Sequence, residues 1–450
     1  MAAGAVTIGI DGGRLDRRVA RSAEAVDALG GRIRDWLGAT AADPVFHRFG
    51  SHLRTLDAVL TGMLDRLRAE LAAVPAETAA GYEHCRGVDR GLATLQQLFR
   101  WYAGKYDQRR AAGHPAVLAA ADEFARSCWS EGFAARGRKP PTGPLCFVDN
   151  RTDALARRRC DVPAELRPAL DDPVAEFVDR LPIPVIALPE PAVREGWWLV
   201  LAAHETGHHV LLDLELGAAV RQALRDAVPP DLVADWTRWH HEVFADLYSV
   251  LMAGPAAAWA IDELQYGPPA HLLRPRGGYP APLVRLALLG ETLEALGAAS
   301  DVPTAAGAAA AADAAAEPHL AALPAIVAAL LDIPLGRGTL RNLALDEVIR
   351  PGPRLQSWAG QLTRPEPAIG AVDTPEAPRI LAAAAVHRYR ALTTAGRDDE
   401  LAALHSGLLS VLARSGAPGV LAPPGETQLD QLAGALGELL VGRAADDEHA

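Results

Sequence analysis

One stretch, AAHETGHHVLLDLE at residues 202–215, constrains the fold of this chain more than any other. It places three histidines and a glutamate within six residues of an otherwise mostly apolar run. A helix that is apolar on most of its faces is expected to be buried. Polar, titratable side chains are costly to bury unless a partner or an ion compensates them. The stretch therefore predicts a buried helix whose polar residues have a specific task.

The composition favours a helical fold. Half of the 450 residues are hydrophobic, and alanine and leucine dominate with little enrichment in β-branched residues. Alanine and leucine favour helices over strands. A chain of this length can form two or three domains that each bury a core. The sequence therefore predicts a mainly α protein.

The net charge of −12 bears on the choice of partners. An acidic chain is repelled by nucleic acid and by anionic membranes, so neither is expected as a partner. The most apolar long stretch, 305–331, is broken by Asp313, Glu317 and two prolines, and it predicts no membrane span. The first residues lack the basic segment and long apolar core of a secretory signal. These features predict a cytoplasmic protein.

The cysteines point to the same compartment. They form no CxxC pair, which argues against a zinc site built from thiolates. In a long chain such scattered cysteines predict free thiols in a reducing environment. They are Cys85, Cys128, Cys146 and Cys160.

Composition breaks divide the chain into three expected segments. Leucines at three- and four-residue spacing between 53 and 71 predict amphipathic helices, and residues 1–135 are expected to form a helical bundle. The stretch RGRKPPTGP then marks a boundary, after which 136–300 carries the polar motifs. Residues 301–450 return to helices separated by Pro/Gly linkers. The two flanking segments show no catalytic pattern and are expected to serve as scaffold or as surfaces for a protein partner.

Short strands are expected only in the middle segment. LCFVDN at 145–150 and IPVIALP at 183–189 are extended candidates, and the second is a β-branched run between prolines. Prolines suit the edge of a sheet, because they cannot donate a ladder hydrogen bond. The middle segment is therefore predicted to be an α+β core with a small sheet ending in an edge strand.

The polar cluster spells H-E-x-x-H. His204 and His208 are four residues apart, so both imidazoles project from one face of a helix and can reach one Zn²⁺ at about 2.0–2.1 Å. Glu205 can lie beside the open position of the metal and take a proton from water. A chance match occurs in on the order of a few per cent of such chains, so core histidines satisfied by their neighbours are the alternative.

A second helix, expected at 231–252, offers a third ligand. A catalytic zinc site has three protein ligands and one exchangeable water. Glu242 and Asp246 lie one turn apart in an apolar setting, and Glu242 is the expected ligand. Asp246 could accept a hydrogen bond from a ligating histidine and fix its tautomer. The alternative is an exposed carboxylate pair on a solvated helix face.

Other residues near the motif have less specific roles. Gly207 costs about 1 kcal/mol in a helix interior, and its expected use is to let another backbone approach closely. His209, His240 and His241 exceed the ligand count. They are expected to support the ligands or to lie on the surface.

HETGHHVLL at 204–212 and EVFADLYSVLMAGP at 242–255 together resemble the gluzincin branch of zinc metallopeptidases. They are most similar to the M48-type peptidases and to the ImmA/IrrE-type regulatory proteases. The resemblance covers about 60 of the 450 residues. It implies a zincin-like domain within 136–300 and one zinc ion per chain.

Carried over by position, the resemblance implies that His204, His208 and Glu242 bind the metal. Glu205 is then the general base, and Asp246 orients a ligand. Departures include Phe244, where those families often have glutamate.

Hydrolysis also needs a donor for the negative oxygen that forms at the attacked carbonyl. The candidates are Tyr279, Arg285, His271 and Tyr248. Tyr279 and Arg285 are preferred, because YPAPLVR follows the second helix much as HPP-x-x-x-R segments do in similar proteins.

The sequence thus predicts a cytoplasmic zinc endopeptidase that cleaves a peptide or protein substrate through metal-activated water. Two alternatives stay open at this point. One is a regulatory protease dedicated to a single partner protein. The other is a non-catalytic helical scaffold with a structural or vestigial metal site.

Overall fold

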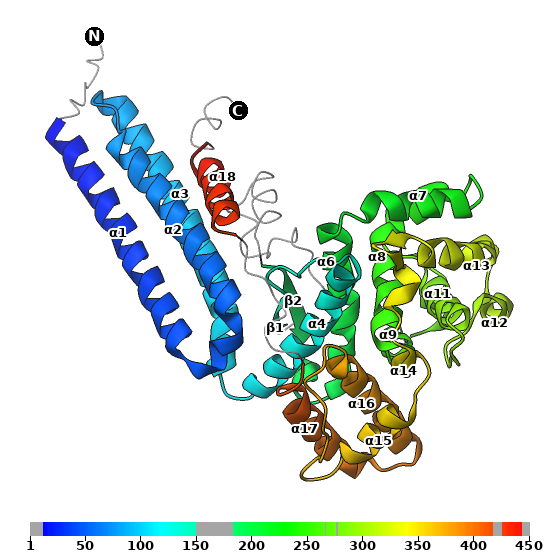
Figure 1. Ribbon diagram of the computed structural model, residues 1–450. Helices are drawn as coiled ribbons and strands as arrows, with labels where there is room; N and C mark the ends of the chain where they lie inside the picture. Colours follow the sequence, from blue (N-terminus) through cyan, green and yellow to red (C-terminus); the bar gives the residue numbers. More distant parts are fainter. Residues whose placement is uncertain (1–11, 150–182, 266, 276–277, 417–424, 443–450) are drawn as a thin grey trace. The chain divides into compact units, whose positions relative to one another are not determined.

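The computed structural model describes residues 12–149, 183–265, 267–275, 278–416 and 425–442. Helices dominate these residues, and the few strands are short (Figure 1). This confirms the predicted mainly α class. None of the described helices combines the length and the apolar character that crossing a bilayer requires.

The chain divides into two compact units. The described part of unit 1 comprises 12–107 and 425–442, and that of unit 2 comprises 108–149 and 183–416. The chain therefore leaves unit 1 after Asp107 and returns to it in its last described helix. This division does not follow the three expected segments, because each unit draws on residues that lie far apart in the sequence.

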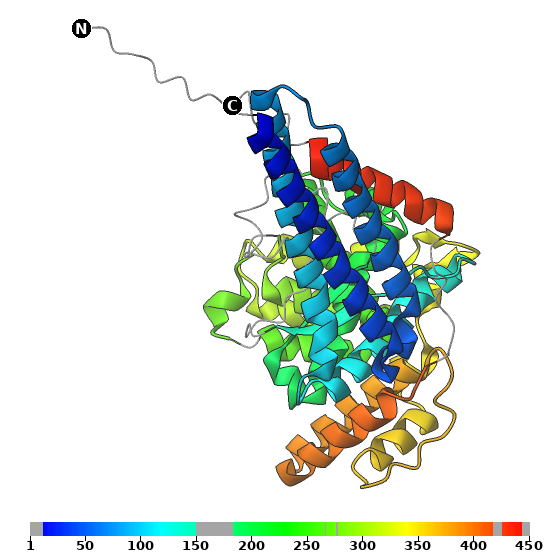
Figure 2. The same ribbon diagram turned by 90° about the vertical axis from the view of Figure 1, so that its left-hand side faces the viewer.

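The described part of unit 1 is a helical bundle. Its elements are α1 (Gly12–Ala42), η1 (Pro44–Phe49), α2 (Gly50–Ala72), α3 (Thr78–Asp107) and α18 (Glu426–Gly442). The leucines that the sequence places on one face of α2 are buried, as expected. Helix α18 packs on α2 and α3 (Figure 2). A Cβ on Gly62 would lie 2.6 Å from the Cβ of Ala433, so the missing side chain permits this close crossing.

Unit 2 surrounds the polar motif. Its first elements are η2 (Gln108–Arg110), α4 (Pro115–Ala135), β1 (Leu145–Asp149), β2 (Val185–Pro189), η4 (Glu190–Val193), η5 (Gly196–Leu201), α6 (Ala202–Asp213), α7 (Gly217–Ala227), α8 (Val233–Ala253), α9 (Pro255–Gln265), α10 (Pro269–Leu272) and α11 (Pro282–Ala295). The later ones are α12 (Ala305–Ala308), η6 (Ala309–Ala311), α13 (Glu317–Leu331), β3 (Pro334–Leu335), β4 (Gly338–Thr339), η7 (Leu340–Leu343), α14 (Asp346–Ile349), α15 (Pro353–Gln361), α16 (Ala377–Thr394), η8 (Asp398–Glu400) and α17 (Leu401–Leu412).

Helix α8 lies at the centre of the core of unit 2. It packs against α6, α7, α9 and α11. Helix α6 in turn packs against α4. Every residue of α8 from Glu242 to Ala253 is buried. A helix that is buried on all faces must be apolar all round or must find partners for its polar residues. The alternative interpretation of Glu242 and Asp246 as an exposed carboxylate pair is therefore wrong, because both residues are buried.

The two expected strands pair with each other. β1 and β2 are parallel, with Leu145 opposite Val185 and Asp149 opposite Pro189. Within the described residues this sheet has two strands, so β2 lies at an edge as the flanking prolines predict. Residue 150 of the first expected strand lies outside the described residues.

Side chains cover the outer edge of β1. The Gln108 amide accepts from the N–H of Val148 and donates to its carbonyl, both at 2.8 Å. The N–H of Cys146 donates to Asp122 Oδ1 at 3.0 Å, and the Cys146 carbonyl accepts from Arg109 at 2.9 Å. These contacts satisfy backbone groups that would otherwise need another strand.

Three of the cysteines lie in the described part of the chain. Cys85, Cys128 and Cys146 are buried free thiols, as expected from their spacing. Cys160 lies outside the described residues.

Removing one partner of the buried Arg109–Asp122 pair is expected to destabilise unit 2. Arg109 donates to both carboxylate oxygens of Asp122, at 2.6 and 2.8 Å. We expect Asp122→Ala to lower the free energy of unfolding by about 3–5 kcal/mol, because it leaves a buried guanidinium without its carboxylate. Chemical denaturation followed by circular dichroism measures the change.

Asp346→Ala is the matched control. Asp346 pairs with Arg350 at the surface, where side-chain exposures are 78% and 60%. A surface pair contributes about 0–1 kcal/mol. An equal decrease in the free energy of unfolding in the two variants would show that burial of the Arg109–Asp122 pair does not raise the cost of breaking it.

Candidate metal centre

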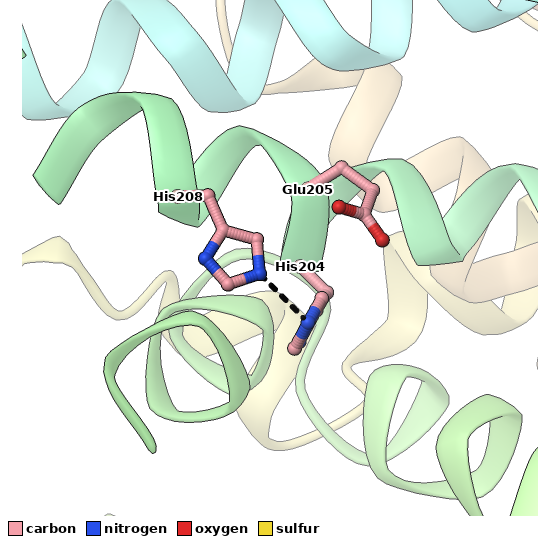
Figure 3. Close-up of side chains that lie close together, drawn as sticks. All are labelled: His204, Glu205 and His208. Carbon is pink, nitrogen blue, oxygen red and sulfur yellow. Dashed lines mark hydrogen bonds between the residues drawn. The ribbon is translucent and has the colours of Figure 1, made fainter. Parts of the chain in front are cut away.

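Helix α6 supplies the two histidines of the site. His204 lies in its first turns and His208 one turn later, so both rings leave the same face of the helix (Figure 3). Their Nε2 atoms lie 3.2 Å apart. The rings are nearly perpendicular, with centroids 4.8 Å apart. This is the arrangement that a four-residue spacing on a helix predicts.

Helix α8 brings the third group. Glu242 Oε2 lies 3.3 Å from His204 Nε2 and 3.4 Å from His208 Nε2. The three atoms therefore form a nearly equilateral triangle. In a tetrahedral site, ligand atoms about 2.0–2.1 Å from zinc are separated by about 3.3–3.4 Å. The triangle has the size that three zinc ligands need.

The state of Glu242 Oε2 also fits a ligand. The atom is buried and accepts no hydrogen bond from the residues that the structure describes. A buried carboxylate oxygen without a donor is costly, unless an ion binds it. The donor set of two imidazoles and one carboxylate is one that zinc prefers in catalytic sites.

Glu205 lies beside the triangle. It is buried, and one of its carboxylate oxygens and the ring nitrogens of His204 and His208 all lie within 4.8 Å of one another (Figure 3). At this distance the carboxylate can reach a water molecule that the metal site would hold.

Asp246 contacts the opposite side of the first histidine. Its Oδ1 lies 2.8 Å from His204 Nδ1. A proton on Nδ1, directed at the carboxylate, leaves the Nε2 lone pair for a metal. Asp246 therefore lies at the Nδ1 side of the His204 ring, whereas Glu242 and His208 lie at its Nε2 side.

Arg285, on α11, holds Asp246 in turn. Its Nε donates to Asp246 Oδ2 at 2.6 Å, and its Nη2 donates to Oδ1 at 2.7 Å. Such a two-point contact fixes the plane of the carboxylate. The sequence had grouped Arg285 with the donors to the reacting carbonyl. In the structure Nε and Nη2 are directed at Asp246, and Nη2 also lies 3.5 Å from His204 Nδ1.

The other candidate donors have different surroundings. Tyr279 is half-buried, and the Arg285 guanidinium lies over its ring at 5.3 Å. Tyr248 is fully buried and donates its hydroxyl to the Cys128 carbonyl at 2.6 Å, so it joins α8 to α4. His271 lies exposed on α10. Tyr279 lies close enough to the site for the charges of Glu242, Glu205 and Asp246 to add to the effect of burial in raising the pKa of its phenol.

The charges of the site are strongly coupled. Burial alone would raise the pKa of Glu242, but the imidazoles of His204 and His208 beside its carboxylate lower that pKa well below its usual value. Burial would also lower the pKa of His204, but Asp246 and Glu242 raise it to about 10. Burial raises and Arg285 lowers the pKa of Asp246, and the net shift is downward. Glu242 and Asp246 therefore carry negative charge next to His204. A divalent metal ion at the imidazole nitrogens would take the place of the His204 proton and offset negative charge of these carboxylates.

The three further histidines have distinct contacts. His209 donates from Nε2 to the Val185 carbonyl at 3.1 Å and so ties α6 to β2. His240 donates from Nδ1 to the Thr237 carbonyl at 2.8 Å, and its Nε2 accepts from Arg221 at 3.1 Å.

His241 lies at the site itself. Its Nε2 is 3.3 Å from Glu242 Oε1, so of the two expected positions, supporting a ligand or lying on the surface, His241 takes the one next to Glu242. Neighbouring residues on a helix point in different directions, so spacing gives no warning of this contact.

Gly207 sets the distance between the two helices of the site. A Cβ at this position would lie 2.9 Å from Ala245 Cα and 3.1 Å from Tyr248 Cβ. The backbone that approaches Gly207 is therefore that of α8, one turn from Glu242. Without a side chain at 207, α8 comes close enough for its carboxylate to meet the imidazoles.

Comparison with known proteins found no relative of this chain. No protein-family model matches the chain, and neither a curated protein nor a solved structure matches it. The gluzincin resemblance stays a prediction carried by the two motifs, and the chemistry of the site follows from its own geometry.

Gly207→Ala is expected to spread α6 and α8 apart. We expect a loss of about 1–3 kcal/mol in the free energy of unfolding and weaker zinc binding, because the added methyl group meets backbone atoms that cannot yield without moving α8. Denaturation and competition with a zinc chelator measure the two effects.

Gly360→Ala serves as the control for that variant, because Gly360 lies on the exposed face of α15 with no atom within 4 Å of an added Cβ. We expect it to be neutral or slightly stabilising. If Gly207→Ala behaved in the same way, the close approach of the two helices would not limit the site.

Proposed function

We propose that this chain is a zinc-dependent peptidase that hydrolyses peptide bonds. The observation that carries the proposal is the triangle of His204 Nε2, His208 Nε2 and Glu242 Oε2, with sides of 3.2, 3.3 and 3.4 Å. Glu205 beside this triangle adds the general base that hydrolysis requires.

The three triangle residues would hold the metal. When bound, zinc would polarise the carbonyl of the substrate and lower the pKa of water in its open position toward ~7. Asp246 is turned toward His204 Nδ1 and Arg285, on the far side of the imidazole. It is therefore not placed to close the site as a fourth ligand, which favours a catalytic site over a structural one.

Glu205 is assigned the proton transfers. As a buried carboxylate near the ligand atoms, it can accept a proton from the attacking water. The same carboxyl group can then donate that proton to the amine that leaves. General acid–base catalysis of this kind contributes about 10²–10⁴-fold.

Tyr279 is assigned the donor to the negative oxygen. Burial and the charge of Glu242 raise the pKa of its phenol, so the hydroxyl keeps its proton at neutral pH. A protonated phenol beside the ligands can donate a hydrogen bond that strengthens as negative charge develops. The Arg285 guanidinium over its ring limits the positions that the phenol can take.

Zinc content and two variants test the proposal. We expect about one zinc per chain in the purified wild type, as one three-ligand site predicts. Glu205→Gln should keep the zinc and lose about 10²–10⁴-fold or more in peptide cleavage, because an amide cannot accept the proton. His204→Ala and Glu242→Ala should lose both zinc and activity. Elemental analysis measures the zinc, and mass spectrometry of a proteome-derived peptide library measures cleavage.

The Glu205→Gln variant also controls for contaminating peptidases, since it differs from the wild type by one atom and keeps the metal. Equal cleavage by both proteins would remove Glu205 from the mechanism. A wild type without zinc would contradict the metal site altogether.

Tyr279 and Arg285 are expected to differ in what they affect. Tyr279→Phe removes one hydroxyl, so it should leave zinc affinity unchanged and lower kcat by about 10²–10³-fold. Arg285→Lys replaces the two-point contact with Asp246, so it should weaken zinc binding by about 10–100-fold. Steady-state kinetics on a peptide selected from the library, together with chelator competition, separate the two effects. Unchanged kcat in Tyr279→Phe would move the donor to another residue.

A further inference from the structure

The two oxygens of Glu242 face different groups. Oε2 points to the imidazoles of α6, and Oε1 lies 3.3 Å from His241 Nε2. A carboxylate that binds a metal is deprotonated and can only accept hydrogen bonds, so the His241 nitrogen that faces Oε1 would carry the proton.

We propose that His241 is a positioning residue for Glu242, which holds the carboxylate so that a single oxygen faces the metal. This inference rests on the metal site of the proposed function. The distances pair His241 with Glu242 Oε1, whereas His204 and His208 lie against Oε2.

The physical reason is the freedom of the glutamate side chain. Its last torsion joins a tetrahedral to a planar carbon and has a broad, nearly two-fold energy profile. Without a second contact, the carboxylate plane can turn away from the imidazoles. The contact of His241 Nε2 with Oε1 at 3.3 Å limits this freedom while Oε2 lies 3.3 and 3.4 Å from the two Nε2 atoms. Partners that orient metal ligands typically change affinity by about 10–100-fold.

The surroundings of His241 hold the ring in place. Its side chain is 16% exposed, and its ring centroid lies 6.0 Å from that of His208. A Cβ on Gly278 would lie 3.6 Å from His241 Nε2, so the backbone just before Tyr279 packs against the imidazole. His241 therefore lies between a metal ligand and the segment that carries the proposed donor to the substrate.

The neighbouring histidine provides a matched control. His240 is on the same helix and its ring centroid lies 5.3 Å from that of His241. Both of its ring nitrogens have other contacts, one with the Thr237 carbonyl and one with Arg221. Its removal changes the local charge and volume in a similar way but leaves Glu242 untouched.

The experiment compares His241→Ala, His241→Gln and His240→Ala in the full-length protein. Zinc dissociation constants come from competition with a chelator, and the visible absorption of the Co²⁺-loaded protein reports the number of ligands. We expect His241→Ala to bind zinc about 10–100-fold more weakly. His241→Gln should recover most of the affinity, because its amide can donate to Oε1. His240→Ala should bind as the wild type does.

The outcomes separate this inference from the proposed function. If the wild type bound zinc and His241→Ala bound it equally well, the positioning role would be refuted while the metal site stood. If the glutamine variant failed to recover affinity and the Co²⁺ spectrum showed one ligand fewer, His241 would be a ligand and the inference would also fall. A wild type that binds no zinc refutes the proposed function itself. Circular dichroism of each variant separates lost binding from lost folding, and the glutamine variant keeps the test valid if the alanine variant unfolds.

Discussion

The close packing of α6 on α8 is the constraint on which the site depends. Gly207 allows the backbone of α8 at Ala245 to approach so closely that a single methyl group would not fit. Two imidazoles and a carboxylate can meet only because these helices are in direct contact, since the Glu242 side chain is too short to bridge a wider gap. Interiors are packed too densely to absorb a change at this point elsewhere. The same contact buries α8 on all sides and forces each of its polar residues to find a partner.

The polar residues meet that requirement in a chain of contacts. Arg285 holds Asp246, Asp246 faces His204, and His204 lies against Glu242 and His208. Burying so many ionisable groups rarely stabilises a protein compared with apolar residues of the same size. Groups whose pKa values are strongly shifted by burial and by specific charged partners are concentrated at functional sites. The metal site that we propose would account for this chain of contacts better than stability does.

The two strands of the sheet β1–β2 have different neighbours. Side chains from η2 and α4 cover the outer edge of β1, whereas β2 is held to the motif helix through His209. The edge of β1 is thus covered by side chains, and β2 is tied to α6, the helix that carries His204 and His208. A two-stranded sheet contributes little stability by itself, so its position depends on the helices around it.

Geometry within single helices and strands explains which features of the site could be predicted from the sequence. A helix places residues four apart on one face, so the pairing of His204 with His208 and of Glu242 with Asp246 followed from spacing alone. The apolar runs around both pairs predicted burial, and the prolines around 183–189 predicted an edge strand. Other contacts between side chains could be seen only in the folded chain: Arg285 donates to Asp246, and His241 lies next to the second oxygen of Glu242. The assignment of α4 to unit 2 and of α18 to unit 1 also depends on tertiary packing. These contacts depend on how elements far apart in the chain pack together, and no pattern within a single element records that.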